Sequence, residues 1–462
     1  MVGRSWSRTG RLGMLLSGVV LVAVAAGALA APASPSPERV AREVLQLFTG
    51  GRWAELRERF APEVRSMVGL QQLEASGRAI AAQLGRLQEV GEAQVRSAPQ
   101  GVQVVLPLRY DKGPAWLYVT IDEKGQLLGF LFGPPPQQAG PARPSGYVPA
   151  PYADRSRFEE RPVVLDTAGV KLPGTFTVPK GTGRYWAVVL VHGSGPQDRD
   201  ETVAANKPFR DLAEGLATRG VAVLRYDKRT YVIRQDERLR QDPALLEAAS
   251  TPDGEVLEDA LEAVRWASRQ EGVRGVVVLG HSLGGMLAPA IAERSHGLVK
   301  GLVLMAANAR PLEQLVPEQL LYLARLDGQV TPEEQHRIDE AKALAQRLGG
   351  HGEPVPLDTN VMGAPARYFY ALHDLAPLPV ASRLSVPMLL LSGGRDYQVP
   401  ETDWRMWEEG LAGRPGVSFR RFAALNHLMM PGEGPSSPEE YAVPSHVDPA
   451  VIDAIVTWLD RL

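Results

Sequence analysis

A single serine lies between glycines in the segment 276–286, which reads VVVLGHSLGGM. The apolar run before it predicts a buried strand, and a helix is expected to follow at once. A turn this tight forces the serine into a strained backbone conformation, so its neighbours must be small. Gly280 and Gly284 meet that need, and Gly285 lets the helix pack closely. Although an ordinary turn serine is the alternative, the pattern predicts that Ser282 is a nucleophile beside the free N–H groups of a helix N-terminus.

A serine hydroxyl needs a base to take its proton, and the chain has eight histidines. Two of them, His427 and His446, follow the last predicted strand at 417–425. His427 lies in the loop directly after that strand, whereas His446 begins the terminal helix, where a solvated or capping role suffices. We predict His427 as the base and keep His446 as the alternative. The other six lie in glycine turns, helices, the cap or its connections: His192, His281, His296, His336, His351 and His373.

The base in turn needs a carboxylate that orients it. Asp396 lies in the loop RDYQVP, directly after the apolar run 387–394. The preceding strand end offers Asn308 but no acid, and Asp403 falls within a predicted helix that would point it elsewhere. We therefore predict Asp396 as the orienting acid, although a purely turn-forming aspartate is the alternative. The order Ser, Asp, His along the chain is the one expected for an α/β sheet of this kind.

The oxyanion that forms when a serine attacks a carbonyl needs two backbone N–H donors. The N–H of Leu283, directly after the nucleophile, is the first. The second is expected from the loop HGSGPQDRD that follows the strand at 186–193. We predict Ser194 for it, with Gly193 or Gly195 as alternatives. His192 is expected to brace this loop, and the charged run 198–200 is expected to hold it through ion pairs.

The elements that position these residues begin near residue 160. Apolar runs alternate with helical patterns, which predicts a mostly parallel sheet covered by helices on both faces. The strands are expected at 186–193, 221–227, 275–282, 301–307, 387–394 and 417–425, after a strand pair at 162–179. The helices are expected at 205–219, 254–270, 283–294, 401–411 and 449–461. The interruption at 309–383 is predicted to form a helical cap without strands at an edge of the sheet, and Tyr368, Phe369 and Tyr370 could line an acyl pocket or merely pack the cap.

The N-terminal part has a different organisation. Residues 36–132 predict a small α+β domain, with a helix capped by Ser36, a second helix at 70–88 and three strands from 102 onward. Residues 133–151 contain seven prolines and are expected to be a semi-rigid linker to a domain at 160–462. Residues 1–30, with three arginines ahead of an apolar stretch, predict a secretory signal peptide and thus an exported protein. An uncleaved membrane anchor is the alternative.

Composition excludes several classes of protein. The 462 residues carry a net charge of −3, which gives no reason to expect a nucleic-acid partner. The chain has no cysteine, so disulfides, thiolate metal sites and a cysteine nucleophile are excluded. No metal-binding or nucleotide-binding motif is present, and we expect neither metal nor cofactor. The oligomeric state is left open.

Several ordered motifs together resemble bacterial carboxylesterases of the α/β-hydrolase superfamily: LVHGSGPQDRDE, LRYDKRTYV, GHSLGG, LSGGRDYQVP and NHLMM. The likeness is to a subgroup with an S-G-P-x-D-R-D loop, and it covers about 160–462. It implies that Ser282, Asp396 and His427 form a triad acting on carboxylic esters. Residues 36–132 resemble a small domain of unknown function found ahead of such hydrolases. The stretch DKRTYV departs from the glycine-rich D-x-R-G-x-G of many wider relatives.

We therefore expect an exported serine hydrolase that cleaves small to medium carboxylic esters through an acyl-enzyme. A peptidase, a thioesterase or an acyltransferase would use the same groups. A binding protein of the cell envelope with an inert hydrolase fold is the alternative from another class.

Overall fold

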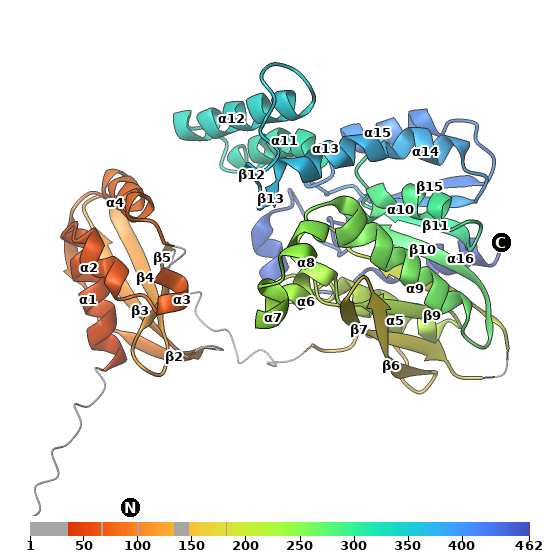
Figure 1. Cartoon of the computed structure of the whole chain (residues 1–462), viewed down its shortest axis with the longest axis horizontal. Coiled ribbons are helices and arrows are strands. Elements are labelled where there is room, and N and C mark those ends of the chain that lie inside the picture. Colours follow the sequence, from red (N-terminus) through yellow and green to blue (C-terminus); the bar gives the residue numbers. More distant parts are fainter. Residues whose placement is uncertain (1–35, 66–67, 99–100, 134–146, 182) are drawn as a thin grey trace, which may run out of the picture. The chain divides into compact units, whose positions relative to one another are not determined.

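The structure is a computed structural model, and it describes residues 36–65, 68–98, 101–133, 147–181 and 183–462. The predicted signal peptide at 1–30 lies outside these ranges. The chain divides between Arg143 and Pro144 into two compact units, which are described separately below (Figure 1). In the described ranges, no helix combines the length and the apolar character that crossing a membrane requires.

The N-terminal unit is an antiparallel sheet with helices, as an α+β domain should be. Its helices are α1 (Pro37–Thr49), α2 (Trp53–Glu58), α3 (Pro62–Arg65) and α4 (Leu70–Leu84). Its strands are β1 (Leu87–Val90), β2 (Gln94–Ala98), β3 (Gly101–Tyr110), β4 (Gly113–Ile121) and β5 (Leu127–Gly133). They run in the order β1-β3-β4-β5, and β2 also pairs with β3.

Three details of this unit differ from the sequence-based expectation. Strands β1 and β2 were not expected, because their alternation is short and mostly polar. Helix α4 ends at Leu84 rather than 88, since Gly85 takes a φ of 80° that breaks the helix. Ser36 precedes α1, but its side chain makes no capping hydrogen bond. The interior is built around Phe48, whose ring lies 4.8 Å from that of Phe132.

The C-terminal unit contains an eight-stranded sheet in the order β15-β14-β11-β10-β8-β9-β7-β6. Strands β6 and β7 form an antiparallel hairpin, and β7 is antiparallel to β9. The other pairs are parallel. The strands are β6 (Phe158–Thr167), β7 (Val170–Pro179), β8 (Tyr185–Val191), β9 (Ala222–Tyr226), β10 (Val273–His281), β11 (Val299–Met305), β14 (Met388–Gly393) and β15 (Val417–Phe422).

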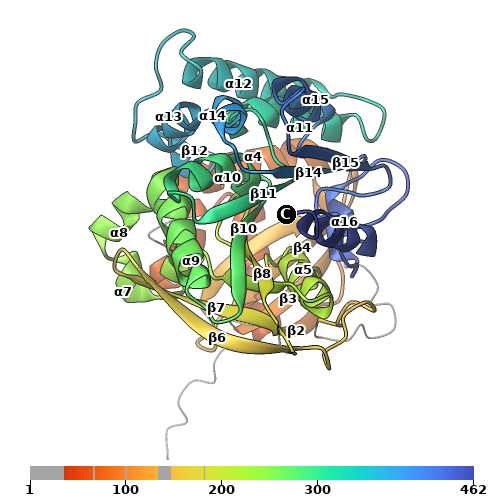
Figure 2. The ribbon, with the colours of Figure 1, turned by 90° about the vertical axis from the view of Figure 1, so that its right-hand side faces the viewer.

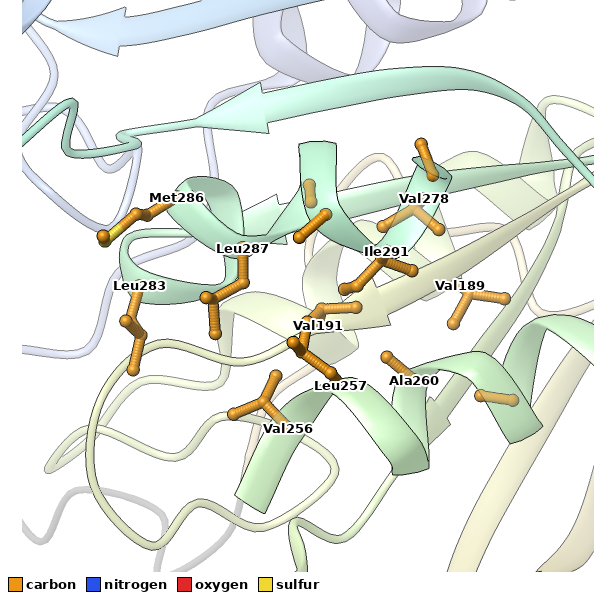
Figure 3. Close-up of a cluster of buried hydrophobic side chains, with 14 of the residues drawn as sticks. Val189, Val191, Val256, Leu257, Ala260, Val278, Leu283, Met286, Leu287 and Ile291 are labelled. Carbon is orange, nitrogen blue, oxygen red and sulfur yellow. The ribbon is translucent and has the colours of Figure 1, made fainter. Parts of the chain in front are cut away.

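Helices cover both faces of this sheet because its central strands are apolar on both sides. Along β8, Val188 and Leu190 pack with α5 (Pro208–Thr218) and α16 (Pro449–Leu459). Val189 and Val191 point to the opposite face, where α9 (Glu258–Ser268) and α10 (Leu283–Arg294) lie (Figure 3). The predicted α/β-hydrolase architecture is therefore confirmed. Helix α15 (Glu401–Gly410) follows β14.

The cap is inserted between β11 and β14. It comprises α11 (Leu312–Ala324), α12 (Pro332–Leu348), β12 (Asn360–Val361), β13 (Ala364–Pro365), α13 (Ala366–Leu375) and α14 (Pro377–Arg383). Its helices α11, α12 and α13 gather on one side of the unit (Figures 1 and 2). Two expectations about it were wrong. Strands β11 and β14 are direct neighbours in the sheet, so the insertion does not lie at an edge strand. The cap also contains a hairpin, β12–β13, turned by Met362 and Gly363 at positive φ.

Two further segments of the C-terminal unit were not anticipated. Residues 229–248 form α6 (Arg229–Gln235), α7 (Glu237–Arg240) and α8 (Pro243–Ala248), and a 3₁₀-helix (Pro438–Ala442) precedes α16. The helix predicted at 254–270 is present, but it begins as a π-helix (Asp253–Leu257) that continues into α9. The end of the predicted linker packs against the hydrolase unit instead of standing free. Tyr147 donates a hydrogen bond of 2.6 Å to Asp211, and Tyr152 donates one of 2.7 Å to the carbonyl of Val447.

Candidate active site

Ser282 occupies the junction of β10 and α10 with a φ of 53° and a ψ of −119°. The left-handed φ is strained for a serine, and the surrounding backbone imposes it. A Cβ at Gly280 would lie 2.1 Å from the Gly284 carbonyl oxygen, and one at Gly284 would lie 2.2 Å from the carbonyl oxygen of Val191. The two glycines are therefore sterically required, which is the reason the sequence pattern suggested.

Asp396 and His427 lie in the loops after β14 and β15, at the same end of the sheet as Ser282. The Nδ1 atom of His427 is 2.8 Å from Oδ2 of Asp396, and both side chains are buried. The other carboxylate oxygen, Oδ1, accepts hydrogen bonds from the backbone N–H groups of Gln398 and Val399, at 2.8 and 2.9 Å. Asp396 is thus fixed by its own loop and presents one oxygen to the imidazole.

His281 joins the loop of His427 to the serine. Its Nε2 atom is 3.0 Å from the carbonyl oxygen of His427, and the two imidazole rings are 4.7 Å apart. Because His281 directly precedes Ser282, this contact links the loop of the predicted base to the segment that carries the predicted nucleophile. In the part of the chain that the structure describes, no hydrogen bond joins the Ser282 hydroxyl to His427, and such bonds often tighten only when substrate binds.

His281 is also paired with Glu201, a contact that the sequence analysis did not anticipate. The Glu201 carboxylate lies 3.0 Å from Nδ1 of His281, and both side chains are buried. Burial lowers the pKa of His281, but Glu201 more than offsets this and the pKa is raised overall. Burial likewise raises the pKa of Glu201, and the attraction of His281 leaves it lowered overall. Glu201 directly follows the charged run 198–200, but nothing in its local sequence points to His281 as its partner.

Of the two predicted oxyanion donors, Ser194 lies in the loop after β8 and Leu283 begins α10. Ser194 and Leu283 both line a cavity together with Ser282. The N–H of Gly193 is occupied, because it donates to Oε1 of Glu201 at 2.8 Å. Within the described ranges, the backbone N–H groups of Ser194 and Leu283 have no hydrogen-bond acceptor. The geometry therefore excludes Gly193 as a donor and leaves Ser194 and Gly195 in this loop.

The charged residues of that loop hold its far end in place. Arg199 forms a bidentate ion pair with Asp227, with nitrogen–oxygen distances of 2.9 and 2.8 Å. Asp200 is bound by Lys207 at 2.8 Å. Nε2 of the buried His192 lies 3.0 Å from the carbonyl oxygen of Asp198, and burial lowers the pKa of His192 to about 4. These contacts brace the loop, which is what we expected of His192 and of the charged run.

The alternative residues are engaged elsewhere. Nδ1 of His446 lies 3.1 Å from a carboxylate oxygen of Asp211. Asp403 accepts hydrogen bonds from the backbone of Ala309 and Arg310 and pairs with the Arg310 guanidinium. Each therefore has a structural partner away from His427.

The cavity beside Ser282 has a volume of about 640 Å³. Its walls come mainly from the cap and from the segment 230–255, and apolar side chains prevail. Among the lining residues are Leu312, Leu315, Val316, Met362, Tyr368 and Phe369. Tyr370 does not line the cavity, and its hydroxyl is hydrogen-bonded to the backbone of Val355 at 2.9 Å. A volume of this size suits a small to medium apolar substrate.

Comparison with known proteins agrees with this architecture. A family model described as alpha/beta hydrolase family matches residues 188–443, more than half of the chain. A second model, described as a protein of unknown function (DUF3887), matches residues 41–130. The chain is 41% identical over 398 residues to Esterase EstD of Thermotoga maritima, covering 86% of this chain and 89% of that protein.

Similar solved structures include Est1E from Butyrivibrio proteoclasticus, at 15% identity and a TM-score of 0.41, covering 65% of this chain and 99% of that one. An esterase from Pyrobaculum calidifontis is 19% identical, with a TM-score of 0.40 over 65% of this chain and 84% of that one. The family resemblance predicted from the motifs is confirmed by the family model and by the Thermotoga relative. The chain belongs to the alpha/beta hydrolase family, and a domain of unknown function precedes its hydrolase domain.

Proposed function

We propose that this protein hydrolyses carboxylic esters through an acyl-enzyme formed on Ser282. The observation that carries the proposal is the juxtaposition of a strained serine at a helix N-terminus with a buried Asp396–His427 pair, joined to it through His281. The esterase name of the Thermotoga relative supports the same reaction.

The first half of the reaction would acylate the serine. His427 takes the hydroxyl proton at Nε2 as the Ser282 oxygen attacks the ester carbonyl. Asp396 accepts the Nδ1–H bond, which keeps Nε2 free to act as the base and stabilises the imidazolium that forms. The N–H groups of Leu283 and Ser194 bind the oxyanion, and His427 then protonates the departing alcohol.

The second half would release the acid. A water molecule gives its proton to Nε2 of His427 and attacks the acyl carbonyl. The tetrahedral intermediate then collapses, the proton returns to Ser282, and the carboxylic acid leaves. The same two N–H groups stabilise the oxyanion in both halves, so the site is used twice without rearrangement.

The cavity favours esters over the other substrates open to such a triad. Its apolar walls and limited volume suit small or medium acyl and alcohol groups. A peptidase, a thioesterase or an acyltransferase would use the same three side chains, so a graded set of substrates has to separate these activities. An inert binding protein would have no use for a strained serine beside an oriented imidazole.

The direct test compares wild type with Ser282→Ala on p-nitrophenyl esters of graded acyl length. We expect kcat to fall by about 10⁴-fold or more, the scale on which loss of a triad member acts. A fluorophosphonate probe should label the wild type and not the variant. Equal hydrolysis rates in the two proteins would refute the assignment of Ser282.

We also propose that residues 1–30 direct export, from their basic start and apolar middle. N-terminal sequencing of the protein recovered after expression in a bacterial host tests this. Cleavage after Ala30 or Ala33 is the expected result. An intact N-terminus in the membrane fraction would favour the uncleaved anchor instead.

A further inference from the structure

Lys228 is a buried cation beside the oxyanion loop that the mechanism above does not use. It follows β9, and only 2% of its surface is exposed. Its Nζ atom donates to the carbonyl oxygens of Gly193 at 3.0 Å and Gly195 at 3.1 Å, and lies 3.0 Å from Oε1 of Glu255. An ammonium has three N–H donors, so every donor has an acceptor. Burying a charge is costly, and here the partners that offset the cost include two loop carbonyls.

The bond to Gly193 has a consequence for the next residue. The carbonyl of Gly193 and the N–H of Ser194 belong to one planar trans peptide, so the two groups point in opposite directions. Holding the carbonyl toward Lys228 therefore directs the Ser194 N–H away from Lys228. The N–H of Gly193 is itself held by Glu201. Drawing electron density toward the ammonium also makes the Ser194 N–H a stronger donor.

Lys228 is held in turn by a link to the cap. Oε1 of Glu255 accepts from Lys228 and from the hydroxyl of Thr230 at 3.2 Å. Oε2 of Glu255 accepts from the hydroxyl of Tyr368 in α13 at 2.5 Å. Glu255 lies in the π-helix, and together with Tyr368 it lines the cavity that contains Ser282. A continuous chain of hydrogen bonds therefore runs from the cap to the peptide of the oxyanion loop.

We propose that Lys228 is a positioning residue that orients the Ser194 N–H for the oxyanion, and that Tyr368 of the cap supports it through Glu255. The inference rests on the proposed function, since it assumes a tetrahedral intermediate formed on Ser282. Lys228 touches neither substrate nor reacting atoms. It acts through the backbone, so its effect belongs to the transition state and not to substrate binding.

The test measures kcat and KM for p-nitrophenyl butyrate in Lys228→Met and Tyr368→Phe. We expect Lys228→Met to lower kcat by about a hundredfold, as loss of an oxyanion donor does, with KM little changed. Tyr368→Phe should lower kcat by about fivefold, because it removes one hydrogen bond from the chain. Tyr370→Phe is the matched control, since its hydroxyl binds Val355 away from the cavity.

A second measurement reports on the binding of the oxyanion alone. A trifluoromethyl ketone with a butyl chain adds to the serine and carries a negative oxygen in the same hole. Its Ki should rise by the same factor as kcat/KM falls in each variant, because it mimics the transition state. If Lys228→Met does not fold, Tyr368→Phe still gives this comparison, since it deletes only a hydroxyl.

The outcomes separate the two proposals. If Ser282→Ala is inactive but Tyr368→Phe and folded Lys228→Met keep the wild-type kcat, the role of Lys228 is wrong and the esterase mechanism stands. A loss that appears in KM alone, or a Ki that stays constant while kcat falls, overturns the positioning role as well. If Ser282→Ala is as active as wild type, both proposals fall together. Parallel losses in kcat/KM and in ketone affinity support the role of Lys228.

Discussion

The sharpest prediction concerns Asp396→Asn, because the structure determines which way the new amide must face. Oδ1 of Asp396 accepts from two backbone N–H groups, those of Gln398 and Val399. In asparagine only the carbonyl oxygen can accept such bonds, so it takes this position. The amide NH₂ is then left 2.8 Å from Nδ1 of His427, in the place of Oδ2.

That orientation puts His427 into the wrong tautomer. The NH₂ group donates to Nδ1, so the imidazole proton moves to Nε2, and Nε2 can no longer take a proton from Ser282. Turning the amide around restores the tautomer but breaks the two backbone hydrogen bonds, at about 1–3 kcal/mol each. The active orientation therefore costs about 2–6 kcal/mol, which lowers kcat by about 30-fold to about 10⁴-fold.

The assay is the kcat for p-nitrophenyl butyrate at neutral pH, with thermal unfolding measured alongside. Asp403→Asn is the matched control, since Asp403 is also buried and also accepts from two backbone N–H groups, those of Ala309 and Arg310. It should lower stability and leave kcat near the wild-type value. An Asp396→Asn protein that is folded and keeps kcat within about threefold of wild type would refute the reasoning.

Three further predictions follow from the described residues. Gly284→Ala should lower the free energy of unfolding, measured by chemical denaturation, by about 3 kcal/mol or more, because its Cβ meets the Val191 carbonyl oxygen at 2.2 Å. Gly183 has open space around it, so Gly183→Ala should change the same free energy by less than about 0.5 kcal/mol. The low pKa of His192, about 4 against 6.5 for the free side chain, means that the unfolded chain gains the proton first, so stability should fall by about 3 kcal/mol as pH drops from 6.5 to 4. This loss of stability between pH 6.5 and 4 should be absent in His192→Gln. If the variant and the wild type lose stability equally over this range, the prediction is wrong. The fragment 144–462 contains every residue of the site and should keep the kcat and KM of the full chain, and a loss of activity in the folded fragment would show that the N-terminal unit contributes.

Much of the sheet was predictable because its signal is local. Ser282 and Asp396 each follow an apolar run that is buried on both faces of the sheet, whereas His427 follows β15, an edge strand of mixed composition that is only partly buried. The glycines beside Ser282 were also predictable, because a Cβ at either position would clash with backbone atoms in a strand-to-helix turn of this kind. For these elements, the types and order of the residues are enough to predict the structure.

The supporting interactions could not be predicted, because their partners are distant in sequence. Glu201 meets His281 across 80 residues, and Lys228 reaches back 35 residues to Gly193. A charged residue in a loop looks the same in sequence whether it is solvated or buried against a partner. The short helices at 229–248 were missed for a related reason, since tertiary packing and capping by Asp236 and Asp242 stabilise them more than periodicity does.

The cavity walls and the reacting groups come from different parts of the chain. Leu312, Leu315 and Val316 belong to α11, and Met362 belongs to the small hairpin, whereas the nucleophile, acid and base all stand at strand ends. Saturation libraries confined to these four cap positions should therefore diversify which acyl chains are accepted while the catalytic geometry stays intact. The insertion gives this scaffold a region in which selectivity can evolve separately from turnover.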